Sequence, residues 1–154
     1  MLYLIPAPLH RAGLRFAHRV RKHWWRLARP QLSGVTLIAR DGEGRILLVR
    51  HSYGGRHWAL PGGGIGKGEN PEDAAVREFT EELDCAIYDL VLANVQESTL
   101  HGAPCTRHVF VGEVVDIPRP DRREIVEIGF FAPGELPTDC SAMIGACLAS
   151  LEQR

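Results

Sequence analysis

The sequence predicts an α/β domain of the α+β kind, in which a mixed β-sheet is sandwiched between helices. Strand-like runs come first, a capped amphipathic helix interrupts them, and further strand-like runs precede a closing helix. The 154 residues fit one domain, and 45% hydrophobic with 24% charged residues is an ordinary globular balance. This balance excludes a disordered chain, a collagen-like repeat and a small disulfide-packed protein.

An extra amphipathic helix is expected ahead of the sheet, over residues 8–29. Its apolar side chains fall on one helical arc and its basic side chains on the opposite arc, and Pro30 ends the pattern. Residues 1–40 hold eight Lys and Arg residues and no Asp or Glu, whereas acidic residues predominate in the remainder. We therefore divide the chain into a basic helical extension, residues 1–32, and a folded domain, residues 33–154.

Four interpretations of the basic helix remain open. Its apolar face docks on the domain or on a second subunit, which would make a homodimer. Alternatively, residues 8–29 bind an anionic membrane surface, bind nucleic acid, or form an Arg-rich organelle-targeting presequence. The four cysteines fit no zinc pattern, and residues 1–9 are apolar before the chain turns basic, the reverse of the order in a secretory signal. We expect reduced thiols and a cytoplasmic protein, with peripheral membrane attachment or organelle targeting as the alternatives.

Two strands open the domain. Residues 34–40 and 45–50 are β-rich runs, and the intervening Asp41-Gly42-Glu43-Gly44 is typical of a hairpin turn. Trp58, which we expect in the core, precedes the glycine turn Pro61-Gly62-Gly63-Gly64.

A well-delimited helix follows over Pro71–Leu83. Asn70 is suited to the N-cap and Pro71 to the first helical position. The remaining elements are strands near residues 90–96, 106–115 and 124–131 and a last helix over residues 140–153.

Three carboxylates gather on one side of the central helix. At about 100° per residue, Glu78, Glu81 and Glu82 share about 100° of arc, next to the apolar face. A solvated acidic face is a poor explanation, because the Glu78–Glu82 repulsion costs about 0.2–0.5 kcal/mol and no lysine lies one turn away to offset it. A divalent cation would turn this repulsion into ligation, and oxygen donors favour Mg²⁺ or Mn²⁺ over zinc.

These residues carry a family resemblance. Gly63 is followed after five residues by Glu69, and after seven more by Arg77-Glu78-Phe79-Thr80-Glu81-Glu82-Leu83-Asp84-Cys85. Residues 63–85 therefore resemble the Nudix box, with every spacing intact. Asp84 replaces the family's glycine and Cys85 fills its last hydrophobic position. Because Asp tolerates a positive φ, we expect metal ligation to remain intact.

The resemblance implies a Nudix hydrolase domain over residues 33–154, with an activity and a set of roles. Such an enzyme cleaves the diphosphate bond of a nucleoside diphosphate linked to another group, giving a nucleoside monophosphate and a phosphorylated remainder, with Mg²⁺ or Mn²⁺ as cofactor. The implied metal ligands are the Gly62 carbonyl, Glu78, Glu81 and Glu82. Arg77 would orient the catalytic glutamate, and Glu69 would fix Arg77. The alternative is a non-catalytic Nudix-fold nucleotide-binding module or regulator, tethered by the basic helix to a membrane or nucleic acid; the intact glutamates favour the enzyme.

The residue that accepts the proton of the attacking water stays open. Glu78 and Glu82 are candidates within the box. Outside it we favour Glu124, because the segment Asp121-Arg122-Arg123-Glu124 leads into the last strand, and Glu127 and Glu97 are its rivals.

Candidates for substrate binding lie outside the box. They supply cations or aromatic rings that would hold phosphates or stack on a base, and they are Arg50, Tyr53, Arg56, His57 and Arg107. The first four lie between the second strand and the glycine turn, where an ordinary polar loop is the alternative. Arg107 and His108 are successive residues before Val109 on a predicted strand, so they lie on opposite faces and we expect one of them to face the cleft.

Overall fold

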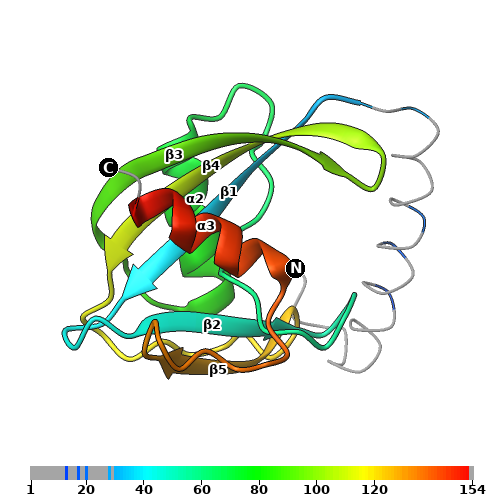
Figure 1. Ribbon diagram of the computed structural model, residues 1–154. Coiled ribbons are helices and arrows are strands. Elements are labelled where there is room, and N and C mark those ends of the chain that lie inside the picture. Colours follow the sequence, from blue (N-terminus) through cyan, green and yellow to red (C-terminus); the bar gives the residue numbers. More distant parts are fainter. Residues whose placement is uncertain (1–12, 14–16, 18–19, 21–27, 29, 153–154) are drawn as a thin grey trace.

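The computed structural model describes residues 30–152, together with the single residues 13, 17, 20 and 28 (Figure 1). Apart from those four positions, the predicted basic helix over residues 8–29 lies outside the described residues, so it and the division at residue 32 remain predictions. Among the described helices, none has the length and apolar character needed to span a membrane.

One mixed sheet organises the described part of the chain. The elements follow in the order β1 (Leu32–Arg40), β2 (Ile46–His51), α2 (Pro71–Leu83), β3 (Tyr88–Leu100), β4 (Ala103–Glu113), β5 (Ile125–Phe131) and α3 (Ala142–Glu152). The five strands lie in the order β3-β4-β1-β2-β5. The central β1 and β4 are parallel, and all other neighbours are antiparallel.

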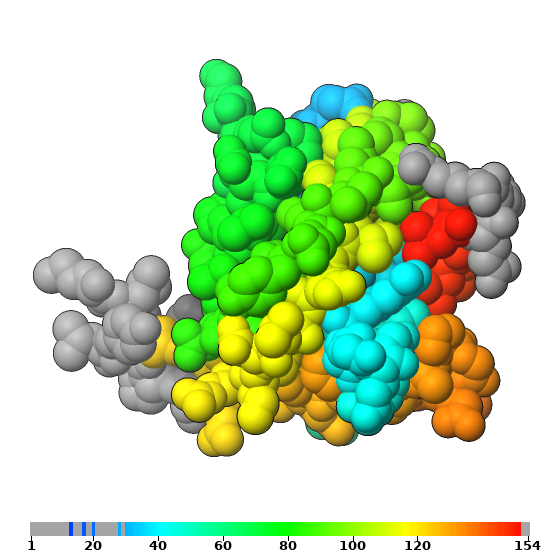
Figure 2. All heavy atoms as spheres, turned by 90° about the vertical axis from the view of Figure 1, so that its left-hand side faces the viewer, coloured from blue at the N-terminus to red at the C-terminus, as the bar shows by residue number. Residues whose placement is uncertain are grey.

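The two helices cover opposite faces of this sheet. Figure 1 shows α3 in front of the strands and α2 behind them, and Figure 2 shows the α2 and α3 regions on either side of the strands. Leu37 and Leu47 pack in the cluster on the α2 side, whereas Ile38 and Leu48 pack on the α3 side. Burial on both faces explains why β1 and β2 are almost continuous apolar runs. The predicted sandwich is confirmed.

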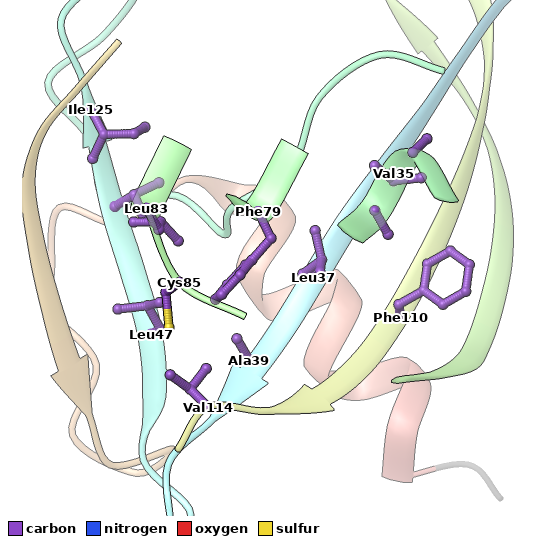
Figure 3. Packing of buried hydrophobic residues seen from close by; sticks show 13 residues of the cluster. Val35, Leu37, Ala39, Leu47, Phe79, Leu83, Cys85, Phe110, Val114 and Ile125 are labelled. Atoms are coloured by element: carbon purple, nitrogen blue, oxygen red, sulfur yellow. The ribbon is translucent and has the colours of Figure 1, made fainter. Parts of the chain in front are cut away.

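Phe79 and Leu83 fix α2 on the sheet (Figure 3). Both side chains are fully buried, and they share a cluster with Leu37 and Leu47 of the central strands. Burial of a side chain of this size contributes about 1.5–3 kcal/mol. Packing therefore sets the position of the helix that carries the glutamates. Cys85 is buried in the same cluster, in the hydrophobic position predicted for it.

The glycine turn is part of the sheet rather than a free loop. β1 and β2 pair only beside their connecting turn and then diverge (Figure 1), and residues 58–65 fill the gap. The amide of Val35 donates to the carbonyl oxygen of Gly63 at 2.9 Å. The amide of Leu37 donates to the carbonyl oxygen of Pro61, also at 2.9 Å. These bonds hold the turn against β1.

Candidate active site

The helix α2 begins and ends where the sequence predicts. The Asn70 side chain caps its start by accepting a hydrogen bond from the amide of Glu72 at 2.8 Å. Asp84 at the C-cap adopts the left-handed conformation, with φ 47° and ψ 42°, and its amide donates to the carbonyl oxygen of Thr80 at 2.9 Å. Asp84 thus takes the conformation for which the Nudix box uses glycine.

Two glycines allow the turn to approach its neighbours closely. Gly62 has φ +145°, and a Cβ there would lie 2.2 Å from the backbone oxygen of Val35. A Cβ on Gly63 would lie 2.3 Å from the carboxyl carbon of Glu78. The amide of Gly62 also makes a long hydrogen bond of 3.4 Å to Glu82. A side chain at residue 62 would therefore clash with the backbone of β1, and a side chain at residue 63 would clash with the carboxylate of Glu78, so both positions need glycine.

Arg77 links the loop before α2 to the glutamates. Its Nε and Nη2 atoms donate to the two carboxylate oxygens of Glu69 at 2.7 and 2.9 Å. Its Nη1 donates to Glu78 at 2.8 Å and makes a longer contact of 3.4 Å with Glu81. The hydrogen bonds from Arg77, with one from the Gly66 amide, lower the pKa of Glu69 to about 2. Glu69 is therefore anionic and holds Arg77 against Glu78 through a bidentate pair.

Glu82 is a buried carboxylate among like charges. Its exposed fraction is only 5%, and burial raises its pKa well above the ordinary range. The nearby Glu78, Glu124 and Asp121 raise the pKa of Glu82 further. Burial also raises the pKa of Glu78, although its hydrogen bond to Arg77 opposes the shift. Within the described part of the chain no cation pairs with Glu82, so the site is short of positive charge.

The donors fit a hard divalent cation in their chemistry. Glu78, Glu82, Glu81 and the carbonyl of Gly62 offer only oxygen, the ligand atom that Mg²⁺ and Mn²⁺ prefer. Glu81 is 63% exposed and lies toward Arg77. No three acidic, His or Cys side chains among the described residues already surround one point. The donors thus lie in one region without forming a complete set of ligands around a single position.

The glutamates line a cleft of about 730 Å³, which is within the range of small-molecule sites. Its lining combines both sides of the sheet. On the α2 side it includes Glu78, Glu81, Glu82 and the glycine turn, and on the α3 side it includes Thr36, Cys105, Arg107, Met143 and Ile144. An acidic region therefore adjoins a more apolar one in the same cleft.

Two of the predicted substrate-binding residues line the cleft. Tyr53 does so, and its hydroxyl donates to Glu124 at 3.3 Å. Arg107 does so as well, and its Nη1 lies 2.9 Å from the sulfur of Met143. Because a thioether is only a weak acceptor, this contact leaves Arg107 able to bind an acceptor of a ligand. Of the alternating pair Arg107 and His108, it is Arg107 that lines the cleft.

The other three predicted substrate-binding residues, Arg50, Arg56 and His57, do not line the cleft. Arg50 pairs with Glu127 at 2.9 Å and with Asp139 at 2.5 Å, and its guanidinium lies 4.4 Å from the ring centre of Trp58. Trp58 itself is buried, as predicted. These ion pairs tie β2 to the chain before α3, so the structure places the Arg50 guanidinium outside the cleft, and its substrate-binding role stays a prediction. Arg56 and His57 are exposed on the loop and are not among the residues that line the cleft.

Of the candidate bases outside the box, Glu124 alone lines the cleft. Glu127 is paired with Arg50 on β5. Glu97 accepts hydrogen bonds from the Thr106 hydroxyl at 2.9 and 3.0 Å, on the β3–β4 pair. The structure thus brings Glu124 to the glutamates of α2 and leaves its rivals elsewhere.

Sequence reasoning missed part of the cleft. Thr36, a polar residue only 5% exposed, and Met143 both line it. Thr36 lies within an apolar strand and Met143 within an apolar helix, so neither stands out by composition. The alternation of β1 offers the one signal for Thr36, because it puts that residue on the same face as Ile38.

Comparison with known proteins identifies the family to which the chain belongs. The family model described as "NUDIX domain" matches residues 30–145. The chain belongs to the Nudix family. Its relatives include several RNA pyrophosphohydrolases, of which two serve as examples. That of Saccharophagus degradans is 36% identical over 66 residues, covering 43% of this chain and 39% of the relative. That of Sulfurovum sp. is 41% identical over 58 residues, covering 37% of each chain. The chain therefore spans well under half the length of these curated relatives.

A solved structure agrees with the family assignment. The MutT Nudix hydrolase from Burkholderia pseudomallei superposes with a TM-score of 0.69 at 28% identity, covering 80% of this chain and 98% of that chain. The predicted Nudix fold is confirmed. Nudix hydrolases generally need a divalent metal, which agrees with the oxygen donors of this site.

Proposed function

We propose that this Nudix protein is a metal-dependent hydrolase of diphosphate bonds. Its substrate is a nucleoside diphosphate linked to another group, and its products are a nucleoside monophosphate and the phosphorylated remainder. The observation that carries the proposal is the linked set of charged groups that the Nudix box places at and beside the cleft. Arg77 is fixed by Glu69 and holds Glu78, while the buried Glu82 has no cationic partner among the described residues.

The protein's own groups divide the work. Glu78 and Glu82, with Glu81 and the Gly62 carbonyl, would hold Mg²⁺ or Mn²⁺. When bound, such a cation offsets the negative charge of the diphosphate and stabilises the charge that develops in the transition state. Arg77 keeps Glu78 in place through its hydrogen bond of 2.8 Å.

Glu124 is the proposed general base. It lines the cleft and is close enough to Glu78 and Glu82 to raise the pKa of both. The Tyr53 hydroxyl donates to one of its carboxylate oxygens at 3.3 Å. The base would accept a proton from the attacking water, a contribution of about 10²–10⁴-fold in rate.

The rest of the substrate would lie toward the α3 side of the cleft. Arg107 and Met143 there offer one cation and one apolar, polarisable wall. This combination suits a base or another ring that carries hydrogen-bond acceptors. Because two relatives are RNA pyrophosphohydrolases, RNA with a 5′-polyphosphate belongs among the substrates to be tested.

The experiment is a substrate panel with the full chain. ADP-ribose, NADH, dinucleoside polyphosphates, sugar nucleotides, oxidised dNTPs and 5′-polyphosphorylated RNA are incubated with Mg²⁺ or Mn²⁺, and the phosphate products are identified by chromatography. Hydrolysis is expected to need the metal and to be lost in Glu82→Gln. Glu72→Gln, on the exposed first turn of the same helix, is the matched control and should be active. Binding of panel members without any hydrolysis would instead favour the non-catalytic module.

We also propose that the basic segment, residues 8–29, acts as a tether to an anionic surface, on the strength of its charge. The full chain and a chain lacking residues 1–30 are compared for retention on anionic liposomes and on DNA. Equal retention of the two chains would contradict the tether without affecting the proposed hydrolysis.

A further inference from the structure

The loop that carries Glu124, residues 114–124, is fastened to the end of α2. The amide of Arg119 donates to the carbonyl oxygen of Leu83 at 2.7 Å, and the amide of Asp121 donates to that of Glu82 at 3.0 Å. The last carbonyls of a helix have no partner within the helix, so these two bonds satisfy them. The loop is thereby joined to the same helical turn that carries Glu82.

The turn before β5 is wound around the side chain of Asp121. Its Oδ1 atom accepts hydrogen bonds from the amides of Arg123 at 3.0 Å, Glu124 at 3.0 Å and Ile125 at 2.8 Å. Its Oδ2 atom accepts a second bond from the Glu124 amide at 3.1 Å. Arg122, inside this turn, has φ 58°, a left-handed conformation that costs about 1–2 kcal/mol outside glycine. The hydrogen bonds to Asp121 offset that cost.

The end of β2 holds Glu124 from the other side. The amide of Ser52 donates to the carbonyl oxygen of Glu124 at 2.7 Å. The Ser52 hydroxyl donates to the carbonyl oxygen of Arg123 at 2.6 Å. The Tyr53 hydroxyl reaches the Glu124 carboxylate itself. The direction of the Glu124 side chain therefore depends on a turn that Asp121 closes.

We propose that Asp121 is a positioning residue for hydrolysis: its carboxylate fixes the turn that presents Glu124 to the cleft beside Glu82. Asp121 is not among the residues that line the cleft, whereas Glu124 is, so Asp121 acts through Glu124 and not on the substrate. This inference rests on the proposed function, in which Glu124 is the general base.

The test is a mutant cycle on the full chain, with kcat and KM measured for the best substrate of the panel. Glu124→Gln is expected to lower kcat by about 10²-fold or more. Asp121→Ala should lower kcat by about 10²-fold with little change in KM, because it displaces the base and not the substrate. Asp121→Asn keeps the Oδ1 acceptor of three amides and should retain most of kcat. Asp121→Ser, a weaker and shorter acceptor, should be intermediate.

The double variant separates positioning from general stability. If Asp121 acts through Glu124, Asp121→Ala in the Glu124→Gln background removes nothing further, so kcat equals that of Glu124→Gln alone. Asp41→Ala is the matched control, because the Asp41 carboxylate likewise accepts hydrogen bonds from backbone amides, those of Glu43 at 3.0 Å and Arg45 at 2.8 Å, in a turn outside the cleft. It should lower the Tm and leave kcat unchanged.

Amide hydrogen exchange reports on the turn without any activity. The amides of Glu124 and Ile125 should be protected in the wild type and in Asp121→Asn, and exchange faster in Asp121→Ala. Two results would overturn the proposal: losses in kcat that multiply in the double variant, or unchanged exchange in Asp121→Ala. If the wild type hydrolyses no panel member, the proposed function fails, and exchange still decides whether Asp121 fixes the position of Glu124.

Discussion

The close approach of Gly63 to Glu78 allows a sharp test of the site by Gly63→Ala. The added Cβ would lie 2.3 Å from the carboxyl carbon of Glu78 and 2.4 and 2.6 Å from its two oxygens. Ordinary contacts between carbon atoms are about 3.5–4.0 Å, so the carboxylate would have to move by about 1 Å. The hydrogen bond of 2.8 Å from Arg77 would be broken or lengthened by the same movement.

Activity should suffer far more than stability. A misplacement of about 1 Å in a catalytic arrangement costs about 10²-fold in rate, which is about 2.7 kcal/mol of activation free energy. The cost to the free energy of unfolding is about 1 kcal/mol for an unfavourable rotamer of Glu78. The loss of backbone freedom in the unfolded chain offsets about 0.4–1 kcal/mol of it. We therefore expect kcat to fall by about 10²-fold with little change in Tm.

The neighbouring glycine supplies the control. A Cβ on Gly64 would meet nothing within 4 Å, and the Gly64 carbonyl that accepts from Arg77 at 3.1 Å is retained in an alanine. Steady-state hydrolysis in Mg²⁺ and thermal unfolding are measured for Gly63→Ala, Gly64→Ala and the wild type. Wild-type kcat in Gly63→Ala, or an equal loss in Gly64→Ala, would refute the reasoning from this contact.

Three further predictions concern charge and substrate. Because burial raises the pKa of Glu82 above its ordinary 4.5, the folded metal-free protein binds extra protons, and its free energy of unfolding should fall as pH rises above about 4.5. Glu82→Gln should remove this fall in urea unfolding and abolish stabilisation by Mg²⁺; an unchanged pH profile would contradict it. Glu69 affects stability in the opposite direction, because folding lowers its pKa from 4.5 to about 2. Its contribution to the free energy of unfolding is fully present above pH 4.5 and is lost as the pH falls toward 2, so Glu69→Gln should flatten the acid side of the same profile. Arg107→Met should raise KM more than it lowers kcat, which initial rates over a substrate range will check, and the reverse pattern would exclude a binding role.

Local signals account for what the sequence predicted well. The bounds of α2 agree at both ends because the Asn70 cap, Pro71 and the apolar period all act within the helix itself. The prediction of residues 90–96 was too short for β3, which spans Tyr88–Leu100. Irregularities in the pairing with β4 shift the register twice in this edge strand, so its alternation is broken.

In the site, too, local sequence predicted some residues, whereas the contacts of others depend on distant parts of the chain. The spacing of the box places Arg77 and the glutamates on one helix, so a single stretch of sequence is enough to predict them. The partners of Arg50, by contrast, are 77 and 89 residues away, and no local pattern indicates ion pairs of such separation. Asp121 is an ordinary turn residue in the sequence. Its relation to α2 arises only when the loop returns to the sheet.

The attachment of this loop to α2 bears on how the site can work. Glu82 is held by the packing of the helix, and Glu124 by a turn bonded to the last carbonyls of that helix, so the two carboxylates belong to one rigid unit. Glu81 differs, because its side chain is 63% exposed and its contact with Arg77 is long, at 3.4 Å. A rigid pair and a movable third donor suit a site that keeps its general base in place while its oxygen ligands adjust to the cation. The buried charge of Glu82, unfavourable in the metal-free protein, is then the feature that makes cation binding favourable.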